Sequence, residues 1–161
     1  MVDLHVDIRI MEEADRADVF ALADEVLRPL AAASGHLERF SEDDFIALMD
    51  RAEVYIAEPG GRPRELAGFA IVETEAAPPE DDSLTLALRC LCLSPAFEES
   101  PVGDRLLEWT EGLAYNRGAA RIAAIVPAAD LPSQRLFRAH EFVAGPAADL
   151  PEAVVMEKRL R

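Results

Sequence analysis

The stretch LTLALRCLCLSPAFEESPVGDRLLEWTEGLAYNRG, from Leu84 to Gly118, decides the fold. Its first part, Leu84–Leu93, is almost wholly apolar and predicts a buried strand. The loop Ser94–Glu99 follows, and Ser100-Pro101 opens a helix that ends near Gly118. Because the first N–H groups of a helix have no partner inside it, a strand–loop–helix unit of this kind predicts an anion site.

The loop that leads into this helix is acidic. Glu98 and Glu99 stand directly before the helix, and Pro101 has no N–H to donate. At about 6 Å, each carboxylate would cost roughly 0.7 kcal/mol per ligand charge in a water-like dielectric and about 3 kcal/mol at an effective dielectric of 20. At molar salt the Debye length of about 3 Å would weaken this repulsion. The geometry therefore predicts an anion, and the charge opposes one.

Composition limits the kinds of partner. The chain has 161 residues, half of them apolar, which suits one domain over residues 1–161. Its net charge of −15, from 31 acidic and 16 basic residues, argues against nucleic acid and anionic membranes as partners. The acidic residues are spread along the chain, which favours a hydrated acidic surface over a cationic partner. With no membrane-length apolar run and no secretory signal, we expect a cytoplasmic protein.

The two cysteines, Cys90 and Cys92, stand two positions apart in the predicted strand. Alternate residues of a strand point to the same face, so both side chains are expected on one side of the sheet. That spacing suits neither a disulfide nor a complete metal site. We therefore predict core packing for both residues, and no metal.

Hydrophobic periodicity predicts the other elements on either side of this stretch. The resulting order is β-α-α-β-β-β-α-β-α-β-β, an α/β (α+β) domain with a mixed central sheet of about six to seven strands flanked by about four helices. The predicted segments are a strand at Val6–Met11, a helix from Asp15 to near Pro29, a helix capped by Ser41, strands at Val54–Glu58, Leu66–Glu75 and Ala120–Val126, a short helix capped by Asp130, and strands at Phe142–Ala144 and Val154–Leu160.

Three segments carry a resemblance to a known family. They are Asp7-Ile8-Arg9-Ile10 before the first helix, Leu91-x-Leu93-x-Pro95 at the end of the long strand, and Phe137-Arg138-Ala139-His140-Glu141-Phe142 near the end of the chain. With the order of elements, they resemble the GNAT superfamily of acyl-CoA-dependent N-acetyltransferases over nearly the whole chain. In that superfamily the third segment usually reads Tyr-Glu-Lys-x-Gly-Phe, and Asp130 stands where Asn is common.

The resemblance implies acetyl-CoA as cosubstrate. Members of the superfamily hold its pyrophosphate with the loop Arg/Gln-x-x-Gly-x-Gly/Ala, and the matching positions here are Glu98, Pro101 and Gly103, of which Gly103 alone agrees. Backbone groups at the end of the preceding strand bind the pantetheine arm and polarise the acyl carbonyl. The implied cofactor-binding residues are Leu91, Cys92, Leu93, Glu98, Glu99, Ser100, Val102, Gly103 and Asp104.

The catalytic groups are less well marked. Phe137 stands where many relatives have the tyrosine that protonates the thiolate, and phenylalanine has no ionisable group. Tyr115, Ser133, His140 or solvent could take its place. Glu73 and Glu75, at the end of the third predicted strand, are candidates for the general base, although each also suits a solvated strand end.

His36, in the connection between the first two helices, is a further candidate base and is equally well explained as an exposed loop residue.

Two functions follow from the resemblance. The first is transfer of an acetyl group from acetyl-CoA to an amine, in a small molecule or a peptide, with a cationic acceptor favoured by the acidic loop. The alternative is a catalytically impaired or repurposed domain of the same fold, acting as a ligand-sensing or interaction module, because the tyrosine and all the motif residues of the loop except Gly103 are replaced. Since many relatives dimerise, a homodimer is also expected.

Overall fold

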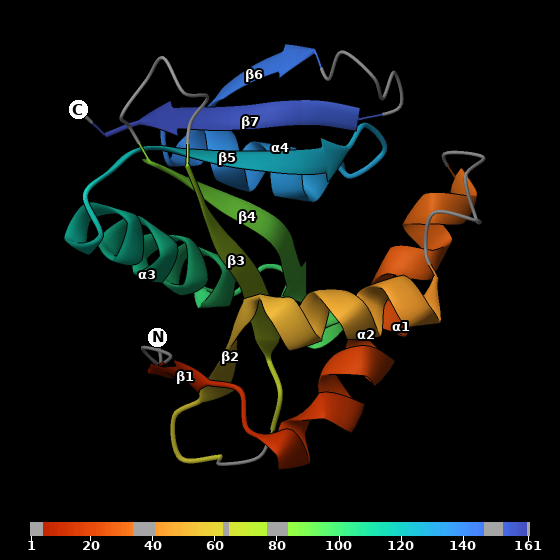
Figure 1. Ribbon diagram of the computed structural model, residues 1–161. Helices are drawn as coiled ribbons and strands as arrows, with labels where there is room; N and C mark the ends of the chain where they lie inside the picture. The colour runs from red at the N-terminus through yellow and green to blue at the C-terminus, as the bar shows by residue number, and fades with distance from the viewer. Residues whose placement is uncertain (1–4, 34–40, 63–64, 77–83, 147–152, 161) are drawn as a thin grey trace.

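Within the described residues, eleven helices and strands follow one another in the predicted order (Figure 1). The computed structural model describes residues 5–33, 41–62, 65–76, 84–146 and 153–160. The elements are β1 Val6–Ile10, α1 Arg16–Ala33, α2 Glu42–Arg51, β2 Glu53–Pro59, β3 Gly68–Ala76, β4 Leu84–Leu93, α3 Val102–Asn116, β5 Ala119–Pro127, α4 Leu131–Ala139, β6 Val143–Pro146 and β7 Ala153–Arg159, with single turns η1 Glu13–Asp15 and η3 Pro95–Phe97.

A seven-stranded sheet in the order β1-β2-β3-β4-β5-β7-β6 forms the centre of the molecule. Each neighbouring pair is antiparallel except β4 and β5, which run parallel. The predicted mixed α/β sheet of six to seven strands with about four helices is therefore confirmed. The parallel pair stands in the middle of the sheet. Its strand β4 is the first part of the stretch that was expected to organise the fold.

A β-bulge interrupts β4 at Arg89. Ile71 of β3 pairs with Cys90, but the next residue of β3, Val72, pairs with Leu88, so Arg89 has no partner in the ladder. A bulge adds one residue to one strand and bends it. Within the described residues, pairing of β4 with β5 ends at Leu88. The two parallel strands therefore separate beyond the bulge and leave an opening between them.

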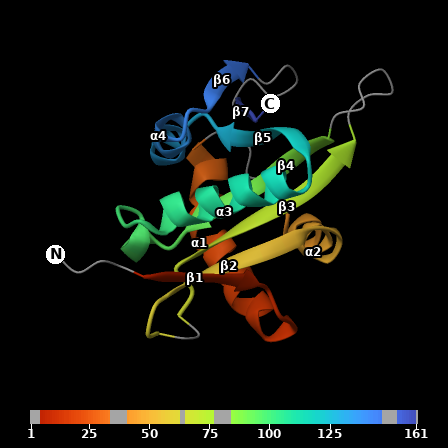
Figure 2. The same ribbon diagram turned by 90° about the vertical axis from the view of Figure 1, so that its left-hand side faces the viewer.

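The helices divide between the two faces of the sheet. Helix α3 lies across one face (Figure 2), where Val102, Leu106 and Leu107 join a core that also contains Phe137 of α4. Helices α1 and α2 pack on the other face through a second core. That core contains Val19, Leu22, Phe45, Met49, Phe69, Ile71 and Cys92, with Cys90 packed against it. The prediction that both cysteines face one core is confirmed.

The first helix is longer than predicted. It was expected to end near Pro29, and it continues through this proline to Ala33. Proline removes the hydrogen bond to the carbonyl of Glu25, four residues earlier. Pro29 and Glu25 are both exposed and both line a cleft, where solvent can reach the helix. Tertiary packing of α1 thus outweighs the local cost of the proline.

Two further predictions need correction. The third helix begins at Val102, with Pro101 in the N-cap position, one residue later than the predicted Ser100 cap. The apolar run Ala120–Val126 suits a strand buried on both faces, yet Ile125 of β5 is 51 % exposed. This residue stands beyond the end of the β4–β5 ladder, where the neighbouring strand has diverged.

None of the helices in the described part of the chain is both long and apolar enough to cross a membrane.

Candidate functional site

Two adjoining clefts occupy the opening between β4 and β5. The first has a volume of about 320 Å³ and lies between the end of β4, the second half of α1 and the starts of α3 and α4. The second has a volume of about 210 Å³ and lies between the bulged part of β4, the end of β5 and helices α1, α2 and α4. The residues that line both clefts are Leu27, Leu91, Asp130 and Ser133.

The first cleft contains about half of the residues predicted to bind a cofactor. Leu91, Leu93, Glu98, Ser100 and Gly103 line it. The side chain of Cys92 instead lies in the α1–α2 core, and Val102 is buried in the α3 core. Neither Glu99 nor Asp104 is among the lining residues. The predicted loop and the end of β4 therefore do meet at one cavity.

The N-terminus of α3 points its first N–H groups toward this loop. The hydroxyl of Ser100 accepts a hydrogen bond from the N–H of Val102 at 3.3 Å and donates one to the carbonyl of Phe97 at 2.6 Å. The N–H groups of Gly103 and Asp104, also in the first turn, have no carbonyl partner within the helix. The start of α3 thus retains donors that suit an anion.

The charge of the first cleft opposes such an anion. Its lining contains the carboxylates of Glu25, Glu98 and Asp130 and, among the described residues, no lysine or arginine. Glu98 stands closest in sequence to the donors of α3, at the end of the η3 turn. The conflict predicted from the sequence is therefore present in the folded protein, through Glu98 rather than through both glutamates.

Gly103 is explained by packing. A Cβ atom at this position would lie 2.9 Å from Cδ2 of Leu136 and 3.1 Å from Cδ1 of Leu93. Such distances require a neighbour to move. The glycine therefore lets α3 approach α4 and β4 closely, whether or not a ligand is present.

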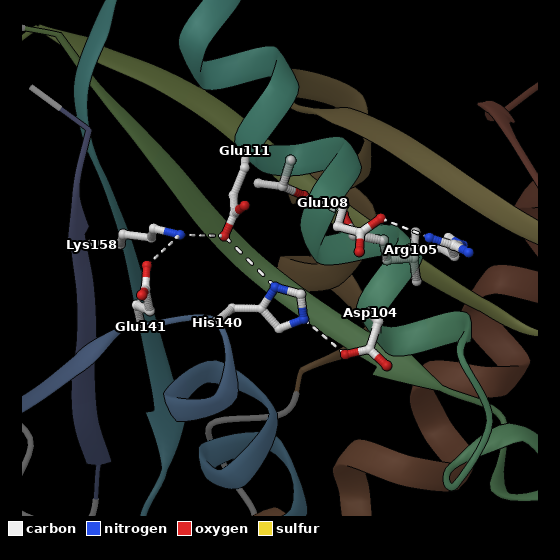
Figure 3. Close-up of polar contacts among 9 residues, drawn as sticks. Asp104, Arg105, Glu108, Glu111, His140, Glu141 and Lys158 are labelled. Carbon is white, nitrogen blue, oxygen red and sulfur yellow. Dashed lines mark hydrogen bonds and ion pairs between the residues drawn. The ribbon is translucent and has the colours of Figure 1, made fainter.

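Asp104 and His140 belong to a polar cluster outside the clefts (Figure 3). Nε2 of His140 lies 2.8 Å from Oδ1 of Asp104, and Nδ1 lies 3.9 Å from Oε1 of Glu111. Lys158 of β7 contacts Glu111 at 3.1 Å and Glu141 at 3.9 Å. The cluster ties α3 to the end of α4 and to β7. It also directs the imidazole, proposed above as a substitute acid, toward these carboxylates, and His140 lines neither cleft.

The second cleft is mainly apolar. Most of its lining is Leu, Ile, Val, Ala, Pro and Phe, and the charged lining residues are Arg89 and Asp130. Phe137 lines it while remaining 2 % exposed, with its ring 5.0 Å from that of Phe142 in an edge-to-face contact. The aromatic side chain of Phe137 is therefore part of the core.

Glu73 and Glu75, the predicted bases, are bound by arginines. Glu73 accepts hydrogen bonds from Arg89 at 2.7 Å and Arg51 at 2.8 Å, and Arg89 also contacts Glu75. The hydrogen bond from Arg89, followed by that from Arg51, lowers the pKa of Glu73, and burial opposes this. Neither glutamate lines a cleft. A carboxylate held in this way is a weak proton acceptor.

Asp130 was placed from the sequence as a helix cap and as the counterpart of a common Asn, without being assigned to the site. Its carboxylate does accept the N–H of Ser133 at 3.2 Å, so the predicted cap of α4 is confirmed. Asp130 and Cys90 of β4 both line the second cleft. Burial, with a smaller contribution from the charge of Asp130, raises the pKa of the Cys90 thiol to about 12. The signal in the sequence was the position of Asp130 shortly after the strand that was predicted at Ala120–Val126.

Three other residues were candidates for the acid or base. Tyr115 is 65 % exposed near the far end of α3 and lines neither cleft. Ser133 lines both clefts at the first turn of α4. His36 lies outside the described residues. Of the three groups proposed to replace the tyrosine, Ser133 is therefore the one at the clefts.

Comparison with known structures identifies the architecture. The PaiA N-acetyltransferase of Thermoplasma acidophilum, solved with coenzyme A, aligns over 97% of this chain and 99% of its own with a TM-score of 0.76 and 17% identity. The NatC complex bound to Gag peptide and CoA contains a chain that aligns over 98% of this chain and 99% of its own, with a TM-score of 0.75 and 13% identity. The chain has the GNAT fold.

A third structure with the GNAT fold covers 91% of this chain but 18% of its own, at a TM-score of 0.74 and 16% identity. It is described as a GCN5-related glucosamine N-acetyltransferase region in a fungal multi-domain β-N-acetylglucosaminidase. By sequence, no family model and no curated protein matches the chain. At sequence identities this low, the structural matches establish the shared fold alone.

Proposed function

We propose that the protein transfers an acetyl group from acetyl-CoA to an amine. The observation that carries this proposal is the opening between the parallel strands β4 and β5, which begins at the Arg89 bulge and leads to the free end of α3. Solved proteins of the same fold include structures with coenzyme A bound. An amine acceptor, in a small molecule or a peptide, is part of the same proposal.

The end of β4 supplies the backbone groups for the pantetheine arm. Because the described pairing with β5 ends at Leu88, the edge of Leu91–Leu93 that faces β5 is not used by that strand. Extended backbone with unused N–H and C=O groups can pair with an amide-containing arm, and an N–H there can polarise an acyl carbonyl. The side chains of Leu91 and Leu93 supply apolar walls at the same place.

The start of α3 supplies donors for the phosphates. The N–H groups of Gly103 and Asp104 fit an anion, and Glu98 lowers its affinity. Acetyl-CoA brings an activated thioester, so the protein has to position the amine and assist the departing sulfur. The hydroxyl of Ser133, at the junction of the clefts, is our choice for the hydrogen-bond donor to that sulfur.

Isothermal titration with acetyl-CoA at low and at molar KCl tests the cosubstrate directly. Salt screens exposed charges, so affinity should rise with KCl if Glu98 repels the phosphates across solvent. Thiol release from acetyl-CoA with a panel of amines then tests transfer. Absence of binding heat at both salt concentrations would exclude acetyl-CoA as cosubstrate.

The repurposed domain is the second candidate. It is favoured by the three carboxylates that line the first cleft and by the buried phenyl ring of Phe137. Glu98→Arg should create acetyl-CoA binding where the parent has none, and turnover of acetyl-CoA by the parent would exclude this candidate. Homodimer formation and a cytoplasmic location stay predictions from the sequence.

A further inference from the structure

Asp130 stands where the two clefts meet. It lines both, whereas the other carboxylates of the first cleft, Glu25 and Glu98, do not line the second. The junction is the point at which a group held in the first cleft can touch a group held in the second. The charge of Asp130 therefore faces any molecule that occupies the second cleft.

The turn before α4 holds this carboxylate in place. The N–H of Asp130 donates to the carbonyl of Pro127 at 3.0 Å, and Oδ1 accepts the N–H of Ser133 at 3.2 Å. Nε2 of the buried Gln134 donates to the carbonyls of Pro127 and Ala128 at 3.2 and 3.0 Å. A carboxylate has about four acceptor positions, so most remain available after the single bond to Ser133.

The charge of Asp130 is not balanced by a cation of the described chain. No salt bridge of Asp130 is found among the described residues, and its one side-chain hydrogen bond is to a backbone N–H. Arg89, the other charged residue of the second cleft, is bound to Glu73 and Glu75. The arginine is therefore already neutralised, and the second cleft presents a net negative charge at its junction with the first.

The walls beside Asp130 are apolar and close together. Leu27, Phe45 and Leu48 contribute from α1 and α2, and Ile125 and Val126 from β5. The volume of about 210 Å³ lies below the range of about 300–1,000 Å³ typical of drug-sized ligands. A cavity of this size and lining suits one small hydrophobic group attached to a positively charged nitrogen.

From this arrangement we infer that Asp130 binds the ammonium group of the acceptor, and that the second cleft holds the small apolar group attached to it. The acceptor class is therefore a primary amine with a compact hydrophobic body, such as an arylalkyl or branched alkyl amine. The inference rests on the proposed function for the identity of the acceptor. Ammonium binding itself can be measured without acetyl-CoA.

The test uses a charged and a neutral probe of the same shape. Benzylamine at pH 7, an ammonium ion, and benzyl alcohol are titrated into the full chain while backbone amide shifts of Cys90, Asp130 and Ser133 are followed by NMR. Asp130→Asn removes the charge and keeps the cap, because asparagine caps helices as well as aspartate does. Glu98→Gln is the matched control, since it removes a carboxylate from the first cleft alone.

We expect benzylammonium to bind the parent and Asp130→Asn to weaken it roughly ten-fold or more, while Glu98→Gln leaves it unchanged. Benzyl alcohol should bind the parent and Asp130→Asn equally. No benzylammonium binding to the parent, or equal binding to parent and Asp130→Asn, would overturn the inference. Asp130→Ser, a second neutral cap, replaces Asp130→Asn if that variant does not fold.

Titration of acetyl-CoA into the same variants separates the two proposals. If acetyl-CoA binds the parent and Asp130→Asn alike, the proposed function stands. The benzylammonium titration then decides by itself whether Asp130 binds the ammonium group. If acetyl-CoA fails to bind the parent, the proposed function fails while the ammonium test still applies. If Asp130→Asn weakens acetyl-CoA and not benzylammonium, Asp130 contacts the cosubstrate and the inference is wrong.

Discussion

Helices α3 and α4 both begin at the first cleft, and they begin differently. At α3 the neutral hydroxyl of Ser100 takes the N–H of Val102 and leaves the positive end of the helix without a counter-charge at the cap. At α4 the carboxylate of Asp130 takes the N–H of Ser133 and adds a full negative charge. At α3 the neutral hydroxyl of the residue before the Pro101 N-cap leaves the helix end positive, whereas at α4 the carboxylate of the N-cap Asp130 makes it negative.

Placing a carboxylate directly before the Pro101 N-cap of α3 should have the largest effect. In Ser100→Asp the carboxylate occupies the first-turn donors and repels phosphate. Two charge-assisted hydrogen bonds of about 1.5 kcal/mol or more each would be lost, so acetyl-CoA affinity should fall roughly 100-fold by isothermal titration. Ser100→Ala keeps the charge unchanged and is the control. Equal affinities of Ser100→Asp and parent would show that α3 does not hold the phosphates.

Reversing the charge of Glu98 should make the start of α3 more attractive to phosphate, the opposite of the effect of Ser100→Asp. Glu98→Arg replaces repulsion by attraction and should raise acetyl-CoA affinity about ten-fold at low salt, with the gain reduced by added KCl. Glu99→Arg adds the same charge at a residue outside the cleft lining and should give a smaller gain. If both variants gain equally, the effect is one of overall charge and the position of Glu98 is irrelevant.

A pair of glycines on α3 tests whether its start is fixed by packing. Gly103→Ala places a methyl group against Leu136 and Leu93, so it should lower the free energy of unfolding by about 1–3 kcal/mol in urea. Gly112→Ala, in the same helix with nothing within 4 Å of the added atom, should raise it by about 1 kcal/mol or less. A neutral Gly103→Ala would mean that the leucines move aside freely.

The smallest effect concerns Glu73 and is visible through pH. Because Arg89 and Arg51 lower the pKa of Glu73, its contribution to stability is full above the ordinary glutamate pKa of about 4.3 and is lost as pH falls through the lowered value. Glu73→Gln should therefore cost about 1 kcal/mol or less at pH 7 and progressively less below pH 4, as measured by urea unfolding. A cost that grows with acidity would contradict this ion pair.

Sequence pattern predicted the order of elements because most segments carry one clear period and end at a cap or turn residue. Ser41 and Asp130 cap α2 and α4 as their positions suggested. The end of α1 was predicted wrongly because Pro29 was judged by its local cost, and the packing of the helix on the sheet cannot be read from that position.

The candidate site was only partly predictable. The loop after β4 could be located by counting from Pro95, but which of its glutamates enters the cleft depends on the η3 turn. The pairing of Glu73 with Arg51 and Arg89 joins β3, α2 and β4, and no local pattern contains it. The bulge had one visible signal, since Arg89 is the charged residue in an otherwise apolar strand.

The extra residue at Arg89 also changes which positions of β4 are equivalent. Before it, the even-numbered Leu86 and Leu88 face the α3 core, and after it the odd-numbered Leu91 and Leu93 do so. Removing this residue would turn no side chain over, since the alternation would then run unbroken along the strand. The separation of the two strands thus begins at a single extra residue that leaves the hydrophobic pattern of both cores intact. A deletion there is a small step by which a lineage could close the opening and keep the fold.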